Sequence, residues 1–332
     1  MSMRGVIRSF SLLGALFLVA GSVQAATLVV ANKAEATVSL VDLRSGKVAA
    51  TLPVGTGPHE VAVSPDGRLA LVANYGEKEP GSTMTLIDIP GAKVVKTIDL
   101  GEYRRPHGAL FLDGRRALVT SELSKAVLEV DVEAGKVVRQ IPTGQEITHM
   151  VAVSPDRSRA YVANIVSGSM TALDLKEGKA MGTVKTGAGT EGIDVTPDGL
   201  QVWITNREDA VKVVDAKTLE VIATIPVATF PIRAKVTPDG KRVLVSAVQS
   251  GDLVVLSAKE RKVEKRIALS EDGPAPVGVI IAPDGKRAWV AHAEGGAVSI
   301  VDLQAGKRTG ALTVGKGPDG MGYSAVDVAA KP

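Results

Sequence analysis

Three of the four histidines in the chain share one position of a repeating pattern. His59, His107 and His149 each stand second in a short apolar segment, directly after Pro or Thr. The same position holds Glu191 in the next segment and Asp319 near the C-terminus. Neutral imidazoles and carboxylates are ligands of Zn, Cu, Fe, Ni and Mn ions. If the segments converge, these side chains can hold a metal ion or a small anionic ligand.

Other polar residues extend this group. Glu60 and Arg233 take the next position of their segments, and His292 ends a segment that returns to the same level. The candidate ligand-binding residues are His59, Glu60, His107, His149, Glu191, Arg233, His292 and Asp319. The residue types do not identify a cofactor but are compatible with a divalent metal ion, whose candidate ligands are His59, His107, His149 and Glu191. The alternative is that these side chains merely solvate the mouth of a water-filled channel.

Composition excludes several other chemistries. The chain has no Cys, which excludes disulfides, Cys-ligated zinc or iron-sulfur sites, a thiolate nucleophile and c-type haem attachment. It contains no GxSxG nucleophile elbow. Its 39 basic and 36 acidic residues give +3, and removal of Arg4 and Arg8 leaves 37 against 36, or +1. With 3% aromatic residues as well, the sequence disfavours nucleic acid as a partner.

The first 25 residues are typical of a secretory signal peptide. Arg4 and Arg8 precede an apolar run from Phe10 to Ala20, and small residues flank Gln24 at the expected cleavage site. The run is too short to span a bilayer as a helix. We expect a periplasmic or secreted mature protein, residues 26–332, that is monomeric and not inserted in a membrane.

The segments that carry the candidate residues belong to an internal repeat. A turn signal recurs about every 41 to 47 residues, at Pro65, Leu112, Pro155, Pro197, Pro238 and Pro283. It reads Pro-Asp-Gly or a close variant, a sequence suited to tight turns. Between the turns lie short runs rich in Val and Ile, which indicate β-strands. A unit of about 43 residues with four such strands is typical of a β-propeller blade.

The two ends of the chain determine the blade count. The mature chain begins with the second, third and fourth strands of a blade, from Thr27 to Val54, and lacks the first. Residues Gly317 to Val328 match the start of a repeat and then stop. Together with six complete copies, they predict an all-β, seven-bladed propeller of four-stranded blades. Three N-terminal strands and one C-terminal strand would share the closing blade, in a single domain over residues 26–332.

Strand direction predicts where a ligand would bind. The first strands of all blades should begin at one face, here called the upper face, and the second strands should end there. Longer loops at Gly76 to Pro80, Glu102 to Arg105 and Ser270 to Ala275 fall on this face. The opposite, lower face should carry tight turns such as Arg44-Ser45-Gly46. Loop elaboration on one face marks the binding side, so we expect a small-molecule or protein partner at the upper face.

The repeat resembles a known family. LVAN at 71–74, YVAN at 161–164 and WITN at 203–206 each follow a Pro-Asp turn. They are similar to the YVTN-type propeller repeats of exported bacterial and archaeal proteins, and the resemblance covers the whole mature chain. It implies a periplasmic or surface location but no single activity. Some similar propellers bind single-stranded DNA, others a haem-type cofactor, and lyases and lactonases of comparable architecture use a metal ion.

Two functional hypotheses of different class follow. The first is a non-catalytic binding protein that holds a ligand or partner at the His- and acid-lined mouth of its central channel. The alternative is a metal-dependent lyase or lactonase that uses the same His/Glu arc. Binding of single-stranded DNA or a haem-type cofactor is the third. The alternative requires His59, His107, His149 and Glu191 to approach a common point.

Overall fold

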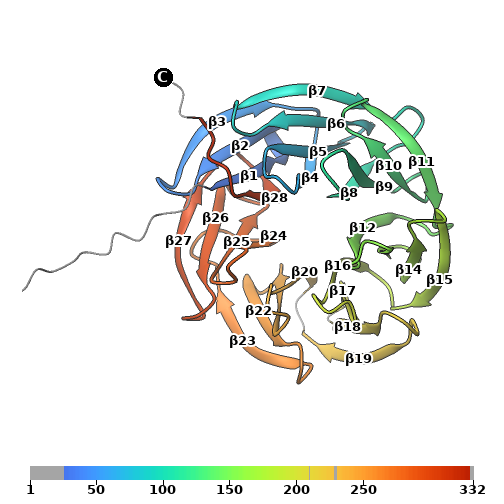
Figure 1. The fold of residues 1–332 in the computed structure, drawn as a ribbon. Helices are drawn as coiled ribbons and strands as arrows, with labels where there is room; N and C mark the ends of the chain where they lie inside the picture. The colour runs from blue at the N-terminus through green and yellow to red at the C-terminus, as the bar shows by residue number, and fades with distance from the viewer. Residues whose placement is uncertain (1–25, 209, 228–229, 330–332) are drawn as a thin grey trace, which may run out of the picture.

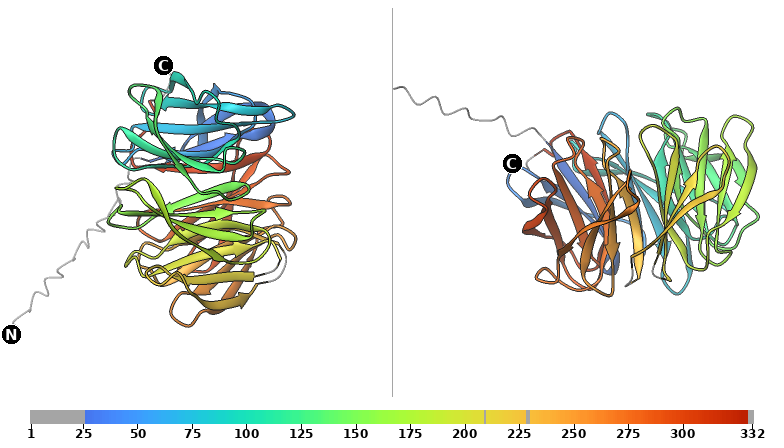
Figure 2. Two further views of the ribbon diagram at one scale, coloured as in Figure 1. Left: turned by 90° about the vertical axis from the view of Figure 1, so that its right-hand side faces the viewer. Right: turned by 90° about the horizontal axis from the view of Figure 1, so that it is seen from below.

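The fold is a closed ring of β-sheets. The structure, a computed structural model, describes residues 26–208, 210–227 and 230–329. In this part of the chain, seven four-stranded sheets are arranged around a central axis (Figure 1). Figure 2 shows the same ring from two further sides. The predicted all-β, seven-bladed fold is confirmed. The predicted signal peptide, residues 1–25, lies outside the described residues.

Six blades are continuous in sequence. Blade 1 contains β4 (Pro58–Val63), β5 (Leu69–Gly76), β6 (Pro80–Asp88) and β7 (Lys93–Asp99). Blade 2 contains β8 (Pro106–Phe111), β9 (Arg116–Ser121), β10 (Ala126–Asp131) and β11 (Lys136–Pro142). Blade 3 contains β12 (Thr148–Val153), β13 (Arg159–Asn164), β14 (Ser169–Asp174) and β15 (Lys179–Lys185).

The other three continuous blades complete the series. Blade 4 contains β16 (Thr190–Val195), β17 (Gln201–Asn206), β18 (Ala210–Asp215) and β19 (Val221–Pro226). Blade 5 contains β20 (Pro231–Val236), β21 (Arg242–Ala247), β22 (Asp252–Ser257) and β23 (Lys262–Ala268). Blade 6 contains β24 (Pro276–Ile281), β25 (Arg287–His292), β26 (Ala297–Asp302) and β27 (Lys307–Thr313). The first strand of each blade lies innermost and the fourth outermost (Figure 1).

The closing blade joins the two ends of the chain as predicted. Its order is β28 (Pro318–Ser324), β1 (Thr27–Asn32), β2 (Thr37–Asp42) and β3 (Lys47–Pro53). Thr27 pairs with Ser324, and its hydroxyl donates to the Val326 carbonyl at 2.7 Å. A single 3-10 turn, η1 (Lys33–Glu35), follows β1. Within the described residues, no helix is long and apolar enough to cross a membrane.

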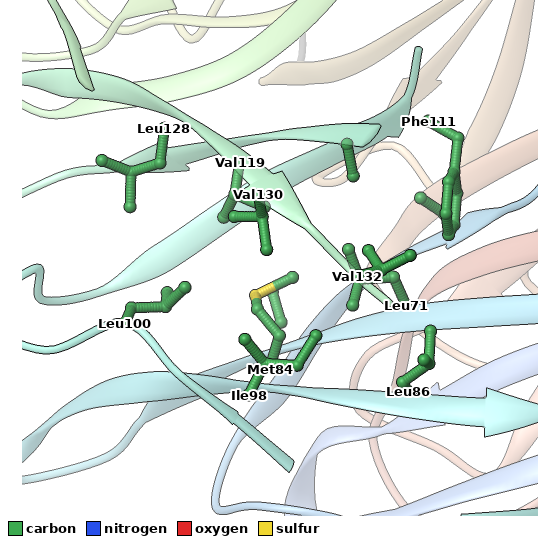
Figure 3. Packing of buried hydrophobic residues seen from close by; sticks show 13 residues of the cluster. Leu71, Met84, Leu86, Ile98, Leu100, Phe111, Val119, Leu128, Val130 and Val132 are labelled. Atoms are coloured by element: carbon green, nitrogen blue, oxygen red, sulfur yellow. The ribbon is translucent and has the colours of Figure 1, made fainter. Parts of the chain in front are cut away.

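The core lies between neighbouring blades. All residues of β1 and of β10 are buried, because the middle strands of a blade are covered on both faces. The outermost strand β11 instead alternates between exposed residues and residues that are partly buried or, at Ile141, buried. Between blades 1 and 2, Met84 and Leu71 pack with Phe111 and Leu128 in one apolar cluster (Figure 3). Burial of this kind is the main stabilising contribution to the ring.

The repeated turns have a common hydrogen-bond pattern. In blade 4, the Thr196 hydroxyl donates to the Asp198 carboxylate at 2.5 Å and accepts from the Gln201 amide at 3.0 Å. Ser64, Ser154 and Thr237 make the same pair of bonds in their own turns. The Pro-Asp-Gly signal therefore forms a self-contained turn at the lower face, which fixes where each first strand ends.

Candidate ligand site at the channel mouth

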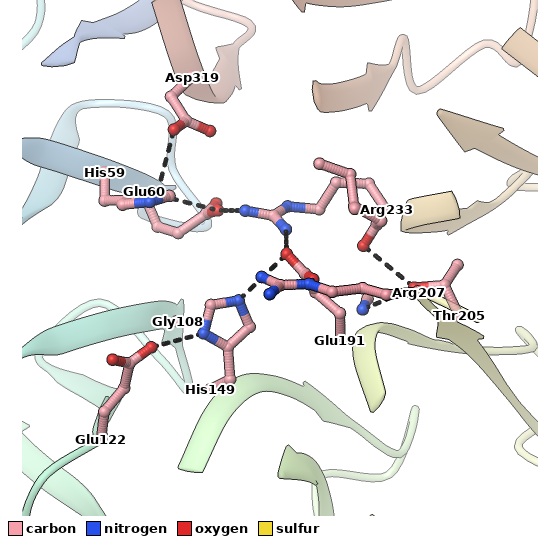
Figure 4. Close-up of polar contacts among 12 residues, drawn as sticks. His59, Glu60, Gly108, Glu122, His149, Glu191, Thr205, Arg207, Arg233 and Asp319 are labelled. Carbon is pink, nitrogen blue, oxygen red and sulfur yellow. Dashed lines mark hydrogen bonds and ion pairs between the residues drawn. The ribbon is translucent and has the colours of Figure 1, made fainter. Parts of the chain in front are cut away.

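The residues that share the second position of each first strand converge, as predicted, at the upper end of the central axis. His59, His107, His149, Glu191 and Asp319 are the second residues of β4, β8, β12, β16 and β28, the innermost strands of neighbouring blades. His107 is fully buried, and the others are buried or nearly so. Figure 4 shows several of these side chains pointing toward one another across the axis. We call this group, together with its direct partners, the mouth cluster.

The three histidines form a continuous stack at the centre of the mouth cluster. The ring centroids of His59 and His107 are 4.2 Å apart, and those of His107 and His149 are 3.6 Å apart. Neither ring nitrogen of His107 has a hydrogen-bond partner among the described residues, and the contact of His149 Nε2 with Glu191 Oε1 is long, at 3.5 Å. Buried nitrogens without partners are costly, so an arrangement of this kind is suited to holding a ligand.

A carboxylate and a phenol support the stack on one side. Glu122 Oε1 lies 2.6 Å from His149 Nδ1, and Glu122 Oε2 accepts a hydrogen bond from the Tyr75 hydroxyl at 2.6 Å. The Tyr75 ring packs edge-on against His59 and His107. Burial first, and then the charge of Glu122, raise the pKa of Tyr75 to about 12, so the phenol remains a donor at neutral pH. His149 is thus oriented with its Nε2 directed away from Glu122.

Arg233 joins opposite sides of the channel. Its guanidinium donates to Glu60 in blade 1 at 2.5 Å and to Glu191 in blade 4 at 3.2 Å (Figure 4). Glu191 also accepts from Arg207. We call the chain Glu60–Arg233–Glu191 the crossbar. Although burial disfavours its charge, the two carboxylates raise the pKa of Arg233, while His149, Arg233 and Arg207 outweigh burial and lower the pKa of Glu191.

The histidines of the stack differ in the direction in which their pKa values are shifted. Burial first, and then the Lys33 charge, lower the pKa of His59 to about 3. Burial and the neighbouring His149 hold the pKa of His107 well below its usual range. Burial also opposes a charge on His149, but hydrogen bonds to Glu122 and Glu191 outweigh it and raise its pKa. His59 and His107 are therefore neutral at pH 7. Each ring then has a lone pair that can bind a metal ion or accept a hydrogen bond.

The structure regroups the predicted metal ligands. Two triads place one ligand atom from each member within 4.8 Å of the others: His59 with Glu60 and His107, and His107 with Glu122 and His149. Glu191 belongs to neither triad and is bound by two arginines, although its Oε1 lies 3.5 Å from His149 Nε2. Imidazole nitrogens and a carboxylate in either triad fit a divalent transition metal. His107 is common to both.

His292 and Asp319 have different surroundings. Asp319 lies beside the stack, with its Oδ2 3.4 Å from His59 Nδ1, and burial raises its pKa. His292 is fully buried and its Nε2 bonds the Ser299 hydroxyl at 2.8 Å, inside blade 6. Asn32 and Asn164 make the equivalent bonds, to Ser39 and Thr171, in their own blades. His292 thus occupies a position at which the repeat uses an asparagine to link its second and third strands.

Four residues that contact the mouth cluster share another repeat position, at the ends of the second strands. Lys33, Glu122 and Arg207 directly follow the last residues of β1, β9 and β17. Tyr75 holds the same repeat position and is the next-to-last residue of β5. Lys33 Nζ lies 2.9 Å from His59 Nε2. In the second strands, the sequence predicted a candidate residue only at the preceding repeat position, which holds His292 in blade 6. The signal was present in the repeat, because the position after it is polar or charged in four of seven blades.

The fold and mouth cluster define a seven-bladed β-propeller with a buried, polar channel mouth. The chain belongs to the YNCE-like beta-propeller family, whose model matches residues 14–114 and 162–282. This confirms the resemblance to YVTN-type propellers. No curated protein matches the chain. Among solved structures, Kuenenia stuttgartiensis Hydrazine Synthase is similar, with 21% identity and a TM-score of 0.74, over 83% of this chain and 92% of that chain. At this identity the likeness concerns the fold alone.

Proposed function

We propose that the protein is an exported binding protein that holds a divalent transition metal ion at its channel mouth. His107 and His149 supply the nitrogens, and Glu122 is the carboxylate within reach of both. The observation that carries the proposal is His107, which is fully buried between two other imidazoles and has no hydrogen-bond partner for either nitrogen among the described residues. The basic n-region and apolar run of residues 1–25 support export.

A metal ion fits this environment better than a proton does. The low pKa of His107 means that burial disfavours a charged ring, whereas a metal ion bound at the lone pair is itself balanced by Glu122. The contact of His149 Nδ1 with Glu122 fixes the ring and leaves the lone pair of Nε2 to bind the metal ion. This orientation is common among metal-binding histidines. The second triad shares His107, but its Glu60 is held by Arg233.

Titration of the metal-free mature protein with Co²⁺ and Zn²⁺ tests the proposal. We expect one ion per chain and a visible Co²⁺ spectrum with nitrogen and oxygen ligands. His107→Ala and Glu122→Gln should each weaken binding by about tenfold or more, as loss of a ligand or its orienting partner does. Glu146→Gln, which changes an exposed carboxylate of the same face, is the matched control. Absence of stoichiometric binding, or equal affinity in all three variants, would contradict the proposal.

A further inference from the structure

The central channel has two parts, and the lower one has more apolar side chains in its walls. Above the crossbar lies the polar mouth cluster. Below it lies a cavity of about 280 Å³, with Glu60 and Arg233 at its upper boundary. Its walls come from the first strands of blades 1, 2, 3, 5 and 6 and of the closing blade, and they include Val63, Leu110, Phe111, Ile280 and Tyr323. We call this cavity the lower chamber.

One cationic side chain in the lower chamber forms no ion pair with a described residue. Lys235, near the end of β20, lines the chamber, and among the described residues no carboxylate lies within 4.0 Å of its ammonium group. The acidic groups that face it have other partners. Glu60 is bound to Arg233, and Asp194 on the neighbouring strand accepts the Val236 amide at 2.9 Å. The charges of the crossbar above the chamber are also balanced, because Arg233 and Arg207 offset Glu60 and Glu191.

We propose that the lower chamber is a second ligand site, which takes a small apolar monocarboxylate with its anionic group at Lys235. The apolar walls would cover the body of the ligand, and the unpaired ammonium would bind the carboxylate in a partly buried setting, where such a bond is strong. The volume suits a single-ring or short-chain acid rather than a larger ligand. The site is separate from the mouth cluster and does not depend on metal binding.

Benzoate and benzamide provide a matched pair of probes, because they differ mainly in charge. Binding of each to the mature protein is measured by calorimetry at neutral pH. We expect benzoate to bind at least about tenfold more tightly than benzamide, and Lys235→Met to remove that preference. Lys241→Met, at an exposed lysine of the lower face, is the control and should leave benzoate binding unchanged. Equal binding of the two probes would overturn the proposal.

A second variant locates the ligand. Ile280→Trp places a large side chain in the lower chamber and should abolish benzoate binding while leaving Co²⁺ binding at the mouth intact. Retained Co²⁺ binding also shows that the variant is folded. Loss of benzoate binding in His107→Ala, together with normal binding in Lys235→Met, would place the anion at the mouth and overturn the inference. Failure of Co²⁺ binding in the wild type would instead contradict only the proposed metal function.

Discussion

At the scale of single residues, the channel mouth combines imidazoles of lowered and of raised pKa within one stack. Burial keeps His59 and His107 neutral, whereas Glu122 and Glu191 favour the charged form of His149. The sequence predicted that these three histidines converge, because one repeat position holds them all. It did not predict the contrast in pKa, because that depends on Glu122, which reaches the stack from a second strand end.

The first prediction concerns the pH dependence of stability in the presence of a chelator. Unfolded histidines gain a proton near pH 6.5. Native His59 and His107 do not, and burial also lowers the pKa of His292, so the native state binds fewer protons and loses stability as pH falls below 6.5. His149 has the opposite sign, since its raised pKa adds stability at low pH that is lost as pH rises.

The contribution of His149 changes mainly above pH 6.5, so the three histidines with lowered pKa dominate below it. The free energy of unfolding should therefore fall between about pH 6.5 and 5, by about 1.4 kcal/mol per pH unit for each unbalanced proton. Urea unfolding at several pH values measures the slope. His59→Gln should make the rise of stability with pH below 6.5 shallower. His149→Gln should remove the loss of stability that His149 causes as pH rises above about 6.5, and so make the slope there more positive. If both substitutions changed the slope in the same direction, the assigned pKa shifts of the stack would be wrong.

The second prediction compares two arginines on one carboxylate. Arg233 and Arg207 both bind Glu191, but the side chain of Arg233 is 5% exposed and that of Arg207 39%. Arg233→Met leaves Glu60 and Glu191 buried without their shared cation, and should lower the free energy of unfolding by about 3 kcal/mol or more. Arg207→Met should cost at most about 1 kcal/mol. Urea unfolding measures both, and similar losses would show that the crossbar is not buried as described.

At the scale of elements, the tight turns of the lower face explain why the fold could be predicted from the sequence. Four of the six repeated turns are closed by a Ser or Thr hydroxyl, as at Thr196. Six of the seven third strands end in an Asp whose carboxylate accepts from a backbone amide of the next turn, as Asp174 does from the Glu177 amide. These contacts are local, so sequence spacing reveals them. The role of His292 was harder to predict from the sequence. Its face was predicted, but its bond to Ser299 follows from a repeat position that usually holds asparagine.

The third prediction uses the one Pro-Asp-Gly turn that lacks the hydroxyl. Ala282 stands where the other Pro-Asp-Gly turns have Ser64, Thr196 or Thr237. The backbone bonds are nevertheless the same, with the Ala282 amide donating to the Arg287 carbonyl at 2.8 Å. Ala282→Ser should therefore raise the free energy of unfolding by about 0.5–1 kcal/mol, while Thr196→Ala should lower it by about 1 kcal/mol or more. Thermal and urea unfolding measure both. Destabilisation by Ala282→Ser would show that the hydroxyl is not what closes the turn.

At the scale of the whole molecule, the ring depends on two contacts between distant parts of the chain. Strand β28 pairs with β1 in the closing blade, and Arg233 links Glu60 to Glu191 across the axis. The sequence predicted the first, because an incomplete repeat at each end can be made complete by the other. It did not predict the second, since nothing in the repeat indicates that the Arg233 side chain spans the channel.

The last prediction tests the closing blade directly. A chain truncated after Gly317 loses β28, together with Met321 and Tyr323 from the core and Asp319 from the mouth. It also exposes the hydrogen-bonding edge of β1, an edge that favours association with other chains. We expect a large fall in the thermal midpoint and concentration-dependent aggregation by light scattering. Truncation after Ala329 keeps the Val328 amide bond to Thr27 and should behave as wild type. A monomeric, equally stable chain ending at Gly317 would show that β28 does not close the ring in solution.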